Sequence, residues 1–148
     1  MFRFTVAALL LVGVSACDAS YDLRDLRVDD LSQDSGALVG TWDLATRTGS
    51  GECTGVCQET VPAAAAQLTD TFTFSADGEY TRSQAWPGGT SDEAARYDVR
   101  RVDYGNGTRS DRAVLFLGDR FESFGLKDDR LYIDTRARDG DLREYRRR

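Results

Sequence analysis

The chain of 148 residues contains no histidine and a single lysine, Lys127. Histidine is the side chain whose ordinary pKa lies closest to neutral pH. Its absence excludes a Ser-His-Asp triad, a histidine general base and histidine metal ligands. The rest of the sequence carries no catalytic signature. We therefore expect a protein that is not an enzyme and that uses no cofactor and no metal.

Positive charge is also scarce, because 25 acidic residues face 19 basic ones and the formal net charge is −6 at pH 7. Proteins that neutralise phosphates carry basic patches, so this balance excludes nucleic acid as a partner. The length suits one folded domain, which we place at residues 37–148.

The first sixteen residues have the layout of a secretory signal peptide. Arg3 supplies a positive charge, and residues 6–14 form an apolar run that is too short to span a bilayer. The run ends in VSAC at residues 14–17, which resembles the lipobox of bacterial lipoproteins. The resemblance implies that residues 1–16 are removed and that Cys17 carries lipid, including an acyl chain such as palmitate.

The same resemblance implies a location in the cell. The protein would be held on a membrane of the bacterial cell envelope through its N-terminal lipid, most simply on the outer membrane, facing the periplasm or the cell surface. Asp18 after the cysteine also resembles an inner-membrane retention signal, so the inner membrane stays open. Residues 17–36 contain six aspartates and are predicted to be a disordered acidic tether.

Two cysteines remain if Cys17 carries lipid, namely Cys53 and Cys57. An even number of cysteines in an exported chain favours one disulfide bond between them. The alternative is a metal site, in which two thiolates are completed by carboxylates.

Short segments of alternating apolar and polar residues follow residue 37 and are separated by turn signals such as Asp77-Gly78 and Asn106-Gly107. Residues 49–68, which follow the first of these segments, show no strand pattern, and a short helix is expected at 62–68. The pattern predicts an all-β domain, an eight-stranded antiparallel up-and-down barrel. The predicted strands lie near 38–47, 69–75, 79–86, 94–104, 111–117, 120–127, 130–137 and 141–147.

Two details favour closure of the barrel. The apolar phase shifts between Val99 and Val102, as it does at a β-bulge. Gly125 lies inside a predicted strand, where strong coiling of a sheet tolerates no side chain.

The first strand contains Gly40-Thr41-Trp42, and this motif at the start of an eight-stranded meander resembles the G-x-W motif of lipocalins. The resemblance implies that Trp42 closes one end of the barrel beneath an arginine of the last strand, either Arg143 or Arg146. A second lipocalin signature is not clearly present, which suggests a short lipocalin-like domain. Trp42 also suits an ordinary strand core.

The resemblance further implies a binding module for a small apolar or amphipathic ligand. The alternative is a structural or interaction lipoprotein, in which aromatic residues fill the barrel and a protein or a polysaccharide is the partner. The arginine-rich end, Arg143 with the arginines at 146–148, would then suit an anionic surface. Candidate ligand-binding residues are Trp42, Phe72, Phe74, Tyr80, Trp86, Tyr97, Tyr104, Phe116 and Phe124, with Phe121 as a further lining candidate.

Overall fold

The computed structural model describes residues 26–50, 58–103, 111–136 and 140–148. Two short 3₁₀ helices, η1 (Val28–Asp30) and η2 (Ser35–Leu38), precede the strands. The strands are β1 (Gly40–Ser50), β2 (Gln58–Pro62), β3 (Thr69–Phe74), β4 (Glu79–Trp86), β5 (Gly89–Asp103), β6 (Asp111–Leu117), β7 (Arg120–Lys127), β8 (Arg130–Asp134) and β9 (Leu142–Arg147).

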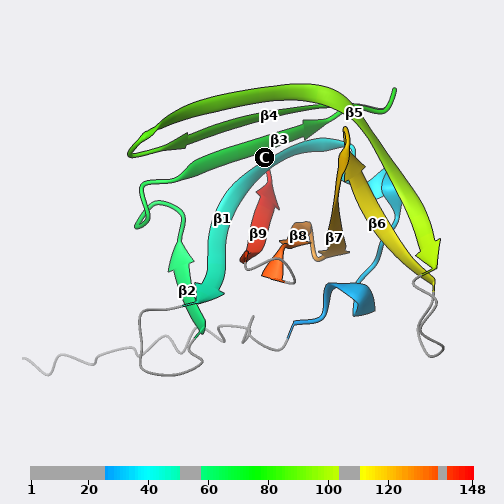
Figure 1. Ribbon diagram of the computed structural model, residues 1–148, viewed down its shortest axis with the longest axis horizontal. Helices are drawn as coiled ribbons and strands as arrows, with labels where there is room; N and C mark the ends of the chain where they lie inside the picture. The colour runs from blue at the N-terminus through cyan, green and yellow to red at the C-terminus, as the bar shows by residue number, and fades with distance from the viewer. Residues whose placement is uncertain (1–25, 51–57, 104–110, 137–139) are drawn as a thin grey trace, which may run out of the picture.

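All nine strands belong to one antiparallel sheet, in which β1 and β3 to β9 pair in chain order and β9 returns to pair with β1 (Figure 1). The all-β class and the eight-stranded up-and-down barrel are therefore confirmed. The first half of β1 pairs with β3, while its second half pairs with the extra strand β2. The prediction of a helix at 62–68 is wrong, because this segment ends β2 and continues as turns.

Hairpin turns lie at positions where the sequence predicts them. Gly78 has a φ of +84°, which glycine adopts without steric cost. Asp128 and Asp129 have φ values of +50° and +56°, as both central residues of a type I′ turn do. The turn predicted at Asn106-Gly107 lies outside the described residues.

The β-bulge lies in a different strand from the one predicted. The pairing of β5 with β6 runs without a register shift from Tyr97 to Asp103, so the bulge expected there is wrong. Val99 and Val102 are both half-buried on opposite faces of β5, which explains the change of apolar phase. The register shift occurs instead between Leu44 and Thr46, where β1 pairs with β9.

An aromatic core fills one end of the barrel. Trp42, Phe72 and Tyr145 are almost completely buried, and the rings of Phe72 and Tyr145 meet edge to face with centroids 5.4 Å apart. The guanidinium of Arg147 lies 4.3 Å from the centre of the Trp42 ring, and Trp42 Nε1 donates to the Leu38 carbonyl at 2.7 Å. This arrangement closes the Trp42 end.

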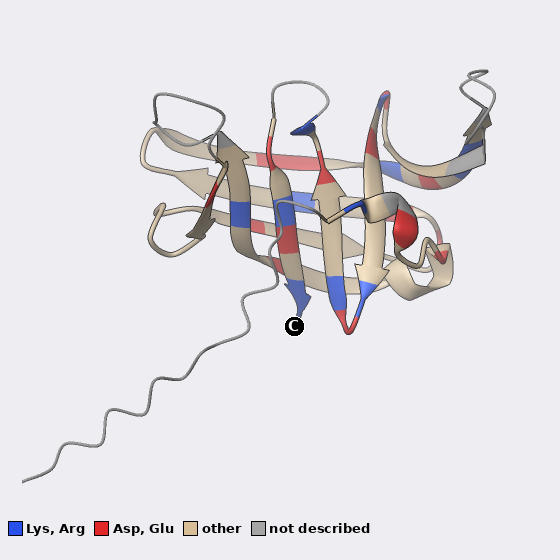
Figure 2. Cartoon of the chain, turned by 90° about the horizontal axis from the view of Figure 1, so that it is seen from below, with Lys and Arg blue, Asp and Glu red and all other residues tan. Residues whose placement is uncertain are grey.

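The arginine over Trp42 is therefore neither of the two predicted residues. Trp42 pairs directly with Arg147 in the register of β1 and β9. Arg146 faces outward because side chains alternate along a strand. Arg143 shares the inward face with Arg147 but lies four residues away, toward the opposite end. Figure 2 shows basic residues at the C-terminal end of β9; there Arg148 pairs with Asp43.

Residues 26–38, which we call the N-terminal clasp, complete the wall between β6 and β7. The two strands pair only as far as Val114 and Ser123. Beyond that point Ser32 and Leu126 exchange two backbone hydrogen bonds, of 3.2 and 2.7 Å. The Gln33 side chain donates to the carbonyl oxygens of Ala113 and Phe124, each at 3.1 Å.

The clasp also buries apolar surface outside the barrel, where Val28 packs with Tyr132 and Leu142. The part of the predicted tether that the structure describes thus lies on the barrel. Gly125 faces the clasp, and a Cβ atom there would lie 2.6 Å from both the Val28 oxygen and the Leu31 Cβ. Close approach of another segment, rather than coiling of the sheet, explains this glycine.

Candidate functional site

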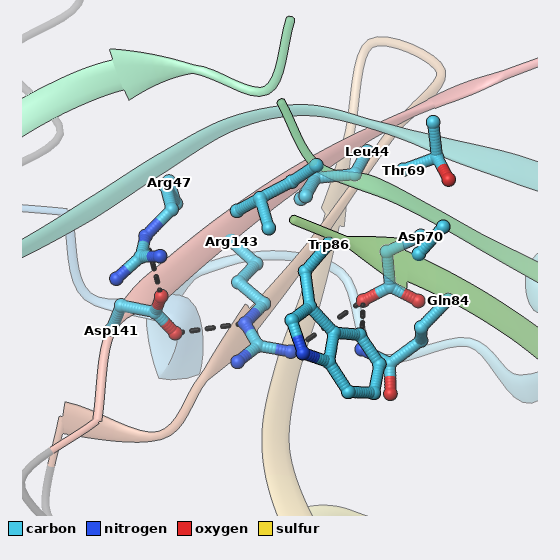
Figure 3. Close-up of a pocket in the computed structure, with 10 residues that line it drawn as sticks. Leu44, Arg47, Thr69, Asp70, Gln84, Trp86, Asp141 and Arg143 are labelled. Carbon is cyan, nitrogen blue, oxygen red and sulfur yellow. Dashed lines mark hydrogen bonds and ion pairs between the residues drawn. The ribbon is translucent and has the colours of Figure 1, made fainter. Parts of the chain in front are cut away.

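A pocket of about 130 Å³ opens at the end of the barrel away from Trp42 (Figure 3). It combines an apolar wall with charged side chains. The apolar side is formed by Leu44, Leu68, Ala85 and Trp86, and the polar side by Arg47, Thr69, Asp70, Gln84, Asp141 and Arg143.

The Asp70 carboxylate at the base of this pocket has a side chain only 3% exposed. Arg82 donates two hydrogen bonds to it, Nε to Oδ1 at 2.8 Å and Nη2 to Oδ2 at 2.6 Å. The Tyr145 hydroxyl and the Gln84 amide donate to Oδ2 at 2.8 and 3.2 Å, and Arg143 Nη1 lies 3.5 Å from it. Since buried charge is tolerated only with such partners, Asp70 organises this end of the interior.

A second carboxylate, Asp141, joins two arginines near the mouth. Its Oδ1 accepts from Arg143 Nε at 2.8 Å, and its Oδ2 forms an ion pair with Arg47 Nε at 3.1 Å. Figure 3 shows these contacts as a continuous chain from Arg47 through Asp141 and Arg143 to Asp70. The polar side of the pocket is thus one connected network.

The β1 bulge puts Arg47 into this network. Trp42 and Leu44 face the interior, so strict alternation would turn Thr46 inward and Arg47 outward. The register shift between Leu44 and Thr46 reverses the alternation. Bulges redirect side chains in this way beside binding sites. Arg47 then lies directly opposite Arg143 on β9.

The surroundings keep Arg82 and Arg143 charged. Burial acts to lower the pKa of Arg82, but its hydrogen bond to Asp70 and nearby negative groups outweigh burial and raise the pKa. The same balance raises the pKa of Arg143, where the negative charge of Asp141 and its hydrogen bond to Arg143 oppose burial. Burial, followed by the charge of Asp70, raises the pKa of Tyr145, which therefore remains a neutral donor.

A separate polar contact lies at the beginning of β4 and joins that strand to β5 and β7. The Tyr80 hydroxyl donates to Glu93, and Arg120 Nη2 donates to the other oxygen of Glu93 at 2.6 Å. Burial, and then the hydrogen bond to Glu93, raise the pKa of Tyr80 to about 12.

This pKa predicts a loss of stability in alkali. An unfolded tyrosine ionises near pH 10, whereas Tyr80 in the folded chain holds its proton to about pH 12. The unfolded state therefore binds fewer protons between these values, and stability falls as the pH rises. We expect Tyr80 to contribute a loss of about 2–3 kcal/mol over this range. Urea unfolding of the parent and of Tyr80→Phe at pH 9 to 12 measures this loss. The expectation is contradicted if the free energy of unfolding falls equally with pH in the two proteins.

The structure separates the predicted ligand-binding residues. Trp42, Phe72, Phe74, Tyr80 and Phe124 are almost completely buried and pack in the core. Tyr97 packs against this core.

Other candidates lie elsewhere. Phe116 faces outward and packs against Phe121, with ring centroids 5.8 Å apart. Tyr104 lies outside the described residues, as do Cys17, Cys53 and Cys57. Trp86 is the predicted ligand-binding residue that lines the pocket.

Sequence reasoning did not single out Asp70, although a signal was present. Asp70 alternates in phase with Phe72 and Phe74, and Arg143 in phase with Tyr145, so each charge falls on an apolar face. A charged residue in that position predicts a buried pair. No such signal marks Arg47, because the bulge that redirects it is not encoded in the apolar pattern.

Comparison of the chain with models of protein families, with curated proteins and with solved structures gave no match. The lipocalin resemblance therefore depends on the chain's own motif and strand order. Within the ranges that the structure describes, no helix is long and apolar enough to cross a membrane.

Proposed function

We propose that this protein is a lipid-anchored envelope lipoprotein whose barrel binds a small amphipathic ligand at the open end rather than in the aromatic core. The observation that carries the proposal is the pocket itself, in which the exposed Trp86 faces a partly buried network of charges. Ligand sites commonly combine an apolar wall with a few fixed polar groups.

The filled core moves the ligand to the mouth. Phe72, Phe74 and Tyr145 occupy the space that a deep ligand would need, and Phe72 stacks on Phe74 with centroids 5.4 Å apart. Trp86 by contrast is 42% exposed. A large aromatic side chain left in solvent beside a pocket marks a surface suited to an apolar partner.

Trp86 provides the test, because the chain has two tryptophans and the other, Trp42, is buried. Binding of an amphiphile should shift the emission of Trp86 to shorter wavelength and leave that of Trp42 unchanged. We expect saturable titrations with short-chain and aromatic amphiphiles. Trp86→Ala should abolish the signal and weaken binding about tenfold in calorimetry, since loss of a packed aromatic contact removes roughly 0.5–1.5 kcal/mol beyond the area that it buries.

Trp42→Phe is the matched control and should retain the titration. Absence of saturable binding to any amphiphile, including lipid extracts of a bacterial envelope, would exclude the ligand proposal. The second candidate would then stand, a structural or interaction lipoprotein, which the densely packed core favours.

The anchor is tested separately. Mass spectrometry of the protein purified from membranes should show a chain beginning at residue 17 with the added mass of lipid. Cys17→Ser should release the protein from the membrane fraction. An unmodified N-terminus in the parent would contradict this part of the proposal.

A further inference from the structure

The charges around the pocket do not balance. Three arginines, Arg47, Arg82 and Arg143, meet two carboxylates, Asp70 and Asp141, among the residues that the structure describes. One positive charge is therefore left without a carboxylate inside the network.

The excess charge is concentrated at the mouth. Arg47 and Arg143 lie directly opposite each other on β1 and β9, and like charges in that position repel. Asp141 relieves the repulsion by contacting the Nε atom of each guanidinium. The terminal nitrogens of Arg47 form no hydrogen bond to a described residue, and its side chain is 44% exposed.

The deep end of the network has no room for a further anion. Asp70 Oδ2 already accepts hydrogen bonds from Arg82, Gln84 and Tyr145. The Asp70 carboxylate thus already pairs with the two inner arginines, Arg82 and Arg143. An external anion would meet Arg47, whose fork of donors suits a carboxylate.

We propose that the ligand is a small monocarboxylate, bound with its carboxylate on Arg47 and its apolar body against Trp86 and Leu44. This inference rests on the proposed function and names its ligand class. One negative charge balances the five charged side chains. The pocket of about 130 Å³ is smaller than the roughly 300–1,000 Å³ typical of sites for drug-sized ligands, which limits the body to about a single ring.

Three compounds of one shape and different charge test the inference, namely benzoate, benzamide and benzamidine. Each is titrated into the full mature protein, with Trp86 emission and calorimetry as readouts. We expect benzoate to bind at least tenfold more tightly than benzamide, and benzamidine not to bind. Added salt should weaken the binding of benzoate and leave that of benzamide unchanged.

Arg47→Gln should remove the preference for benzoate without changing the affinity for benzamide, and Arg47→Lys should retain part of it. Arg146→Gln is the matched control, because Arg146 is 63% exposed and lies 3.5 Å from Glu144 on the outer wall. Thermal unfolding of all variants checks that the fold persists. A preference that survives in Arg47→Gln would overturn the role of this residue.

The outcomes separate the two proposals. Equal binding of benzoate and benzamide would overturn the inference and leave the ligand-binding function intact. Binding of larger amphiphiles with no response to any of the three compounds would also overturn the inference alone. No response to either set would overturn both.

Discussion

Replacing Asp70 by alanine should lower the free energy of unfolding by about 3–5 kcal/mol, the usual effect of removing one partner of a buried ion pair. The substitution leaves Arg82 charged, with its side chain 10% exposed and its bidentate acceptor gone. It also removes the acceptor of the Tyr145 hydroxyl. Buried donors without partners make unfolding easier because water would satisfy them.

Urea unfolding followed by circular dichroism measures this loss. Asp77→Ala is the matched control, since Asp77 lies exposed in a hairpin turn and bonds mainly to Ser75. Formate added to Asp70→Ala should restore part of the stability by occupying the vacated acceptor position. A loss below about 1 kcal/mol, within the range of a single ordinary hydrogen bond, would show that Asp70 does not organise the network.

Gly125→Ala should detach the N-terminal clasp. The new methyl group would lie 2.6 Å from the Val28 carbonyl oxygen, and that oxygen belongs to the backbone, so the clasp itself must move. Moving it breaks the backbone pairing of Ser32 with Leu126 and exposes Val28. We expect a loss of about 3 kcal/mol, given overpacking of 1–3 kcal/mol and 1.5–3 kcal/mol for each exposed side chain.

Hydrogen exchange locates the effect. The amide of Leu126 should exchange much faster in Gly125→Ala, whereas amides of β3 and β4 should keep their protection. Gly36→Ala is the control inside the same segment, because a Cβ there approaches its nearest neighbour, Asp34, no closer than 3.4 Å. Unchanged protection at Leu126 would show that the clasp accommodates the methyl group.

The meander was predictable because its evidence is local. Turn residues such as Gly78 and the pair Asp128-Asp129 separate segments in which apolar and polar residues alternate. Each hairpin can therefore be predicted from residues that are close together in the sequence. Trp42 also occupies the position that its motif implies. Closure into a barrel leaves no exposed sheet edge, which is one of the ways in which proteins prevent edge-to-edge association.

What the sequence did not reveal depends on contacts between distant segments. The clasp joins Gln33 to Ala113 and Phe124, 80 and 91 residues away. The partner of Trp42 depends on the register of β9, which no local pattern specifies. Arg47 enters the pocket through a bulge, where one extra residue reverses every side chain beyond it.

The clasp also shortens the length of chain that could separate the barrel from a lipid at residue 17. On a chain acylated at Cys17, as we propose, Leu26 lies nine residues further along the chain than the acylated cysteine, and its carbonyl oxygen accepts a hydrogen bond from Arg136 at 2.8 Å. However those residues are arranged, they reach no further than about 30 Å. Had the whole segment to residue 37 been free, the reach would be about twice as long. On that proposal the barrel would be confined close to the bilayer surface and would meet its ligands there rather than far from the membrane.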